Sequence, residues 1–101
     1  MKKTLLITAF FMLVSIFSFA QTSAEGYFDR GDSKYELQDY RGAIQDYSKA
    51  IELDPSNADA YYNRGGVKYF LNDIDGACLD WSKAGELGYY DAYDRIKEYC
   101  N

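Results

Sequence analysis

Residues 24–57 read AEGYFDRGDSKYELQDYRGAIQDYSKAIELDPSN, and residues 58–91 read ADAYYNRGGVKYFLNDIDGACLDWSKAGELGYYD. The two segments align without a gap, and 16 of the 34 aligned positions are identical. A repeat of this length is the signature of a stacked architecture, in which each repeat covers the apolar face of its neighbour. The period of 34 residues therefore determines the expected architecture.

Each repeat is predicted to form two helices, because its apolar and small residues recur at helical spacings. A segment after the second repeat has the same character, with Tyr93, Ile96 and Tyr99 or Cys100 on one face. We therefore expect an all-α fold of five helices, over residues 24–37, 40–53, 58–71, 74–87 and 90–100.

Turn residues separate the expected helices. Asp39 and Asp73 each follow a polar residue and precede a second helix, so they are predicted to be its N-cap. Pro55 ends the first repeat because proline cannot continue a helix, and Gly88 takes that role in the second repeat. Each boundary therefore has a residue type suited to it.

Small residues and large rings alternate along the repeats. Gly31 and Gly65 allow the helix axes to approach closely, and Tyr47 and Trp81 are predicted to fill the grooves that this opens. The 11 tyrosines suit such thin layers, because the ring can be buried while its hydroxyl reaches water. We interpret the aromatic residues first as packing residues.

This pattern resembles the tetratricopeptide repeat family. The resemblance covers residues 24 to roughly 91 and implies an α/α superhelical fold with repeats over 24–57 and 58–91 and a capping helix over 90–101. The matching residues occupy the family's small and large positions: Tyr27, Gly31, Ala43, Tyr47, Ala50, Pro55, Tyr61, Gly65, Ala77, Trp81 and Ala84.

Two departures from the family pattern recur in both repeats. Arg30 and Arg64 stand where the family often has leucine, and Lys34 and Lys68 stand where it often has tyrosine. Two repeats are also fewer than the three usually needed for a robust array, so the last helix is expected to act as the cap.

The first 20 residues have the pattern of a secretory signal peptide. Lys2 and Lys3 precede an apolar run over 5–20, and Ser18 and Ala20 supply the small residues of a cleavage site, with a short tail over 21–23. The alternative is an uncleaved membrane anchor, but the run would reach only about 24 Å against a bilayer core of about 30 Å. We expect an exported chain, periplasmic or extracellular, with no membrane anchor after cleavage.

Composition excludes several classes of function. The 101 residues contain no histidine, so there is no Ser-His-Asp triad and no histidine zinc site, and two cysteines cannot form a four-thiolate site. Without Lys2 and Lys3 the chain has 9 basic and 16 acidic residues, a net charge of −7, which disfavours nucleic acid. We expect no enzyme activity, no cofactor and no metal.

The two cysteines are Cys78 on the second helix of repeat two and Cys100 on the capping helix. An even count in a small exported chain favours a disulfide, and packed neighbouring helices could bring these thiols together. The alternative is two free thiols.

The resemblance implies that the first helices line a concave face and supply the contacts to a partner protein or peptide. These positions combine aromatic rings with acids, which favours a basic or polar peptide. The family's carboxylate-binding set is matched only by Asn63 and is not predicted. The predicted partner-binding residues are Glu25, Phe28, Asp32, Tyr35, Glu36, Asp59, Tyr62, Tyr69 and Phe70, with Gly66 on the same face.

The leading hypothesis is therefore a non-catalytic protein–protein interaction module, monomeric or weakly oligomeric. Two alternatives remain open at this point. Tyrosine and tryptophan platforms suit a glycan-binding accessory protein. The few repeats leave end faces that would also suit a self-assembling structural protein of the cell envelope.

Overall fold

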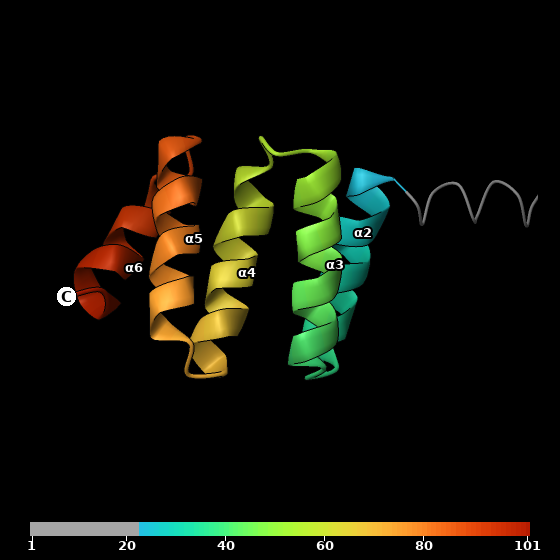
Figure 1. Cartoon of the computed structure of the whole chain (residues 1–101), viewed down its shortest axis with the longest axis horizontal. Coiled ribbons are helices and arrows are strands. Elements are labelled where there is room, and N and C mark those ends of the chain that lie inside the picture. Colours follow the sequence, from blue (N-terminus) through green and yellow to red (C-terminus); the bar gives the residue numbers. More distant parts are fainter. Residues whose placement is uncertain (1–22) are drawn as a thin grey trace, which may run out of the picture.

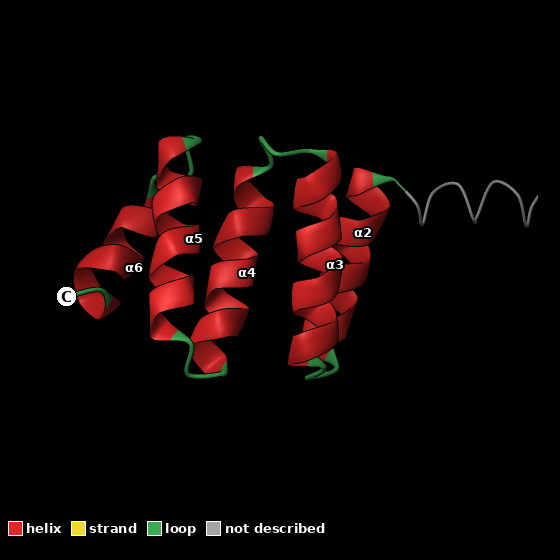
Figure 2. Ribbon diagram, viewed as in Figure 1, coloured by secondary structure: helices red, strands yellow, loops and turns green. Residues whose placement is uncertain are grey.

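The computed structural model describes residues 23–101, and the expected signal peptide with its cleavage site lies outside them. The described residues form five helices joined by short turns (Figures 1 and 2). None of these helices is long and apolar enough to cross a membrane. The helices are α2 (Ala24–Glu36), α3 (Tyr40–Leu53), α4 (Ala58–Phe70), α5 (Ile74–Glu86) and α6 (Asp91–Tyr99).

The helices follow one another as an array in which α2 packs on α3, α3 on α4, α4 on α5, and α5 on α6. In Figure 1 the four long helices run side by side in alternating directions, and α6 closes the array at its C-terminal end. The fold is therefore all-α, as the sequence predicts. Each of the four long helices begins at the expected residue.

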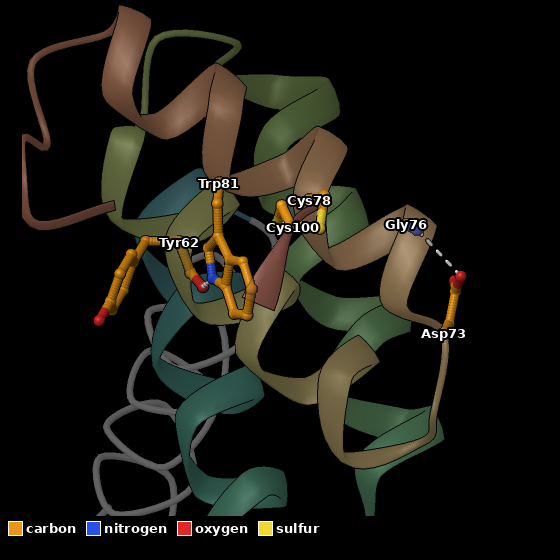
Figure 3. The surroundings of a disulfide bond; sticks show 6 residues. All are labelled: Tyr62, Asp73, Gly76, Cys78, Trp81 and Cys100. Atoms are coloured by element: carbon orange, nitrogen blue, oxygen red, sulfur yellow. Dashed lines mark hydrogen bonds between the residues drawn. A yellow bond between two sulfur atoms is a disulfide. The ribbon is translucent and has the colours of Figure 1, made fainter. Parts of the chain in front are cut away.

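The turns between paired helices have the same construction in both repeats. Asp39 and Asp73 accept a hydrogen bond from the backbone amide three residues later, at 3.0 Å in each case; Figure 3 shows the cap of α5. Gln38 and Asn72 precede them with φ of 61° and 65°, and Gly88 has φ of 104°. These left-handed residues reverse the chain, and Asn and Gly adopt such a backbone most readily.

Each long helix pair packs an aromatic ring against a glycine. A Cβ on Gly31 would lie 2.7 Å from the ring of Tyr47, and a Cβ on Gly65 would lie 2.8 Å from Trp81. Tyr47 is 1% exposed and Trp81 is 3% exposed. The ring of each second helix therefore occupies the space that a side chain would take on the first helix.

Replacing Gly65 by alanine is expected to lower the free energy of unfolding by about 1–3 kcal/mol, because the added methyl group overpacks this contact. Gly66 is the matched control, since a Cβ there meets nothing within 4 Å. Gly66→Ala should raise the free energy of unfolding by about 0.5–1 kcal/mol, because glycine is unfavourable inside a helix. Urea denaturation of both variants measures this, and equal stabilities would contradict the packing argument.

In the first repeat, Arg30 and Lys34, which depart from the family pattern, both contact one buried carboxylate. Asp46 on α3 is 3% exposed. Arg30 donates from Nε and Nη2 to its two oxygens, at 2.9 and 2.8 Å, and Lys34 Nζ lies 2.9 Å from Oδ2. Burial opposes ionisation of Asp46, but these hydrogen bonds and positive charges outweigh it, so the pKa of Asp46 is lowered.

The second repeat contains the same arrangement in a more enclosed form. Asp80 on α5 is 4% exposed and accepts two hydrogen bonds from Arg64, at 2.8 and 2.7 Å, while Lys68 Nζ lies 3.0 Å away. Arg64 also donates from Nη1 to Ser48 Oγ at 3.1 Å, which links α4 to α3. A bidentate arginine and a lysine therefore join each helix pair where the family often has leucine and tyrosine.

The cap α6 is held on α5 by a covalent bond and by side-chain packing. Cys78 and Cys100 form a disulfide with their Cα atoms 5.9 Å apart (Figure 3). Ala92 is fully buried, and a Cβ on Gly85 would lie 2.7 Å from the ring of Tyr93. The bond ties the end of α6 to the middle of α5.

Candidate functional site

A groove of about 490 Å³ crosses the array. Its walls come mainly from the first helices α2 and α4 and from the cap α6, and its floor includes residues of α3 and α5. Six of the nine predicted partner-binding residues line it: Asp32, Tyr35, Glu36, Tyr62, Tyr69 and Phe70.

Three predicted partner-binding residues, Glu25, Phe28 and Asp59, lie outside the lining of the groove. Phe28 packs beside Tyr47, with ring centroids 5.8 Å apart, so it belongs to the core of the first repeat. Glu25 and Asp59 are exposed in the first turns of α2 and α4. Gly66, expected on the same face, does line the groove.

Six of the 13 residues that line the groove were not predicted from the sequence, and these include both residues from α6. The missed residues are Tyr47, Asn63, Val67, Trp81, Arg95 and Tyr99. Tyr47 and Trp81 were expected only as packing residues, and both also form part of the floor. The helical face of Tyr99 was recognisable in the sequence, but nothing there indicated that α6 folds back beside α4.

Aromatic rings form the inner part of the groove. Tyr69 lies 4.6 Å from Tyr99 and 6.0 Å from Trp81, measured between ring centroids. The indole Nε1 of Trp81 donates to the backbone carbonyl of Tyr62 at 3.3 Å, as Figure 3 shows. This bond satisfies the buried donor of Trp81 and fixes its ring beneath the groove.

The outer edge of the groove is a second, more exposed group of rings. Tyr40 and Phe70 stack with their centroids 5.7 Å apart, and Tyr35 lies 5.9 Å from Tyr40 and 6.1 Å from Phe70. Phe70 is 58% exposed and Tyr35 is 38% exposed. Within the described residues these two rings are covered only in part, so they remain accessible to a ligand.

Asp32 supplies a carboxylate on the α2 side of the groove. Its Oδ1 accepts hydrogen bonds from the Tyr47 hydroxyl and from Asn63 Nδ2, the latter at 3.2 Å. Burial and the neighbouring Asp32 carboxylate raise the pKa of Tyr47, so this hydroxyl stays protonated and continues to donate. The three residues come from α2, α3 and α4, and their network fixes the carboxylate in place.

Arg95 supplies a cation on the α6 side. Its Nε donates to the Tyr62 hydroxyl at 3.0 Å, and this bond is the main reason that the pKa of Arg95 is raised. Tyr62 in turn stacks on Tyr89, with ring centroids 4.3 Å apart. The groove therefore has an acidic side on α2, an aromatic centre and a basic side on α6.

The chemistry that these groups provide is recognition. Stacking on rings, hydrogen bonds from amides and hydroxyls, and ion pairing with Asp32, Glu36 or Arg95 can all hold a ligand. Over residues 23–101, no group of three or more Cys, Asp or Glu side chains is placed to hold a metal ion. The arrangement thus favours a binding surface of mixed aromatic and charged character.

Comparison with known proteins agrees with the fold. A family model described as "TPR repeat" matches residues 31–72. Two crystal structures of MamA superpose with TM-scores of 0.70 and 0.69, at 31% and 32% sequence identity, over 72% of this chain. None of the curated proteins compared with the chain matches it. The family match and the two superpositions support a tetratricopeptide repeat protein.

The repeat match and the likeness to MamA support a protein–protein interaction scaffold. The matched part is 44% of one MamA chain and 41% of the other, so the chain spans less than half of either. The likeness therefore concerns the repeat fold and its stacking of helices, within which the groove of this chain is built.

Proposed function

We propose that this chain binds an extended segment of a partner protein in the groove between α2, α4 and α6. The observation that carries the proposal is the pair of partly exposed rings, Tyr35 and Phe70, at the edge of an aromatic groove. Aromatic anchors in a preformed groove are the residues that most often dominate binding energy. The floor is rigid, because Trp81 and Tyr47 are buried and hydrogen-bonded.

We further propose that the chain acts after export, in the periplasm or outside the cell. The support is the basic start and apolar run of residues 1–20, which match a signal peptide. The pairing of Cys78 with Cys100 agrees with this, because disulfides persist in oxidising compartments. A fusion of residues 1–22 to a reporter that is active only after export would test it.

The groove assignment is tested with a phage-displayed library of random 12-residue peptides. The wild-type domain should enrich a set of peptides, and Tyr35→Ala combined with Phe70→Ala should weaken their binding at least tenfold. Both rings are partly exposed, so the double variant should keep its helical circular dichroism. Leu79→Ser is the matched control, because Leu79 is 73% exposed and lies outside the groove.

Two results would overturn the proposal. If the library yields no enriched peptide, the groove does not bind extended segments. If the double variant binds the enriched peptides as well as the Leu79→Ser control does, binding takes place elsewhere on the surface.

A glycan is the second candidate ligand, favoured by the polar groups that lie beside the rings. Asn63 and Arg95 both line the groove and carry donors suited to sugar hydroxyls. However, Asn63 already donates to Asp32, and Arg95 already donates to Tyr62, so part of this capacity is used internally. Binding in an oligosaccharide array that is lost in the same ring variant, without any peptide enrichment, would assign the groove to glycans.

A further inference from the structure

The helix α2 carries an unbroken row of acidic side chains along one face. Glu25, Asp29, Asp32 and Glu36 lie at positions i, i+4, i+7 and i+11, which places them within an arc of about 60° at 3.6 residues per turn. We name these four residues the acidic ridge. Its last two members line the groove, so the ridge is continuous with the proposed binding surface.

No cation within residues 23–101 forms an ion pair with the ridge. Its residues are absent from the ion pairs of the described residues, which join other acids to six cations: Arg30, Lys34, Lys49, Arg64, Lys68 and Lys83. The two cations of α2 itself are Arg30 and Lys34, and both reach across to Asp46 on α3. They stand two residues from Asp32, and residues at that spacing face away from each other on a helix.

The ridge is unfavourable in the free protein. Like charges at i and i+4, such as Asp32 and Glu36, destabilise a helix by a few tenths of a kcal/mol per pair. The chain's net charge of −7 without Lys2 and Lys3 adds to this repulsion. A partner that carries positive charge would remove it.

Asp32 is the member of the ridge best placed to fix such a charge. Its Oδ1 is held by Tyr47 and Asn63, whereas its Oδ2 has no hydrogen-bond partner within the described residues. Asp32 is half-buried and lines the groove together with Tyr35, which stands three residues later on α2. A cation here would meet a positioned oxygen and an aromatic surface in the same place.

We propose that the segment bound in the groove is basic, with lysine or arginine side chains along the acidic ridge and apolar side chains on the rings beside it. The proposal rests on the proposed groove function and specifies its partner. Asp32 and Glu36 are separated by about 6 Å along α2, and alternate residues of an extended chain are about 6.6 Å apart. Basic residues at alternate positions would therefore follow the ridge while the intervening residues face the other way.

The enriched library peptides provide the first measurement. Relative to the input library, they should contain at least threefold more lysine and arginine. In fluorescence anisotropy, replacing these residues by glutamine in an enriched peptide should weaken binding to the wild-type domain at least tenfold. The affinity of the original peptide should also fall as salt is raised, because exposed charges are screened.

A double-mutant cycle then locates the charge. Asp32→Asn combined with Glu36→Gln removes two charges while the new amide oxygen can still accept from Tyr47 and Asn63. This variant should bind the original peptide at least tenfold more weakly and the glutamine peptide with unchanged affinity. The matched control is Glu52→Gln combined with Glu86→Gln, which changes the net charge equally at exposed sites outside the groove.

The outcomes separate this inference from the proposed function. Enriched peptides that lose affinity in the ring variant but are not basic would leave the groove assignment intact and overturn the basic partner. An equal effect of the control variant would overturn the role of the ridge, because the attraction would then be a property of the total charge. The absence of any enriched peptide would overturn both proposals.

Discussion

Asp80→Ala is expected to lower the free energy of unfolding by about 3–5 kcal/mol, which is the usual cost of removing one partner from a buried ion pair. The loss leaves the guanidinium of Arg64 and the ammonium of Lys68 without their carboxylate, and the Arg64 side chain is only 17% exposed. Small domains have little stability to lose, so much of the variant should be unfolded at 25 °C. Circular dichroism during urea denaturation measures the change.

The equivalent change in the first repeat is the matched control. Asp46→Ala should cost less, because the Arg30 side chain is 42% exposed and water can solvate it once its partner is gone. Stability should return when Asp80→Ala is combined with Arg64→Leu and Lys68→Tyr, since a buried ion pair can be replaced by apolar residues of similar volume. Wild-type stability of Asp80→Ala alone would show that this buried cluster does not hold the helix pair together.

Loss of the Cys78–Cys100 disulfide has the second largest expected effect. Cys100→Ser should lower the free energy of unfolding by about 3 kcal/mol, because the bond closes a loop with a sequence separation of 22. The remaining attachment of α6 is small. The helix has nine residues, of which only Ala92 is buried, and so short a helix is marginal without tertiary support.

The fluorescence of Trp81 reports whether α6 stays in place. Trp81 is the single tryptophan of the chain, is 3% exposed, and lies 6.0 Å from Tyr99 of α6 between ring centroids. Cys100→Ser should shift its emission to longer wavelength as water reaches the indole. Reduction of the wild-type protein should give the same shift, whereas treatment of the variant with the same reductant should add nothing. Unchanged emission in both cases would show that packing alone holds the cap.

Arg30, Arg64, Lys34 and Lys68 show where inference from the sequence stopped short. They could be recognised as departures from the family pattern, but not as the partners of Asp46 and Asp80. The missing information was spatial, because Arg30 and Asp46 are 16 residues apart and come together only when α2 packs on α3. A charge at an expected apolar position is costly unless it is paired, and the structure supplies the pair.

The groove likewise contains residues that could be predicted from the sequence and residues whose place depends on tertiary packing. The six predicted residues of the groove come from α2 and α4, where the resemblance to the tetratricopeptide repeat family implies the partner-binding face. Tyr99 and Arg95 come from α6, which lies outside the period and has no counterpart in the first repeat. Their positions depend on how the cap turns back after Gly88 and on the disulfide that holds its end.

The sequence by itself determined the helices, their order and, to within one residue, their boundaries. Turn residues, caps and the spacing of apolar side chains act within a few residues, and the period of 34 repeats that local information twice. Only the tertiary structure decided which charges are buried together, which rings form the groove floor, and that α6 completes the groove. These features depend on contacts between residues far apart in the chain, such as Asp32 with Asn63 and Tyr62 with Arg95. A local sequence pattern does not predict such contacts.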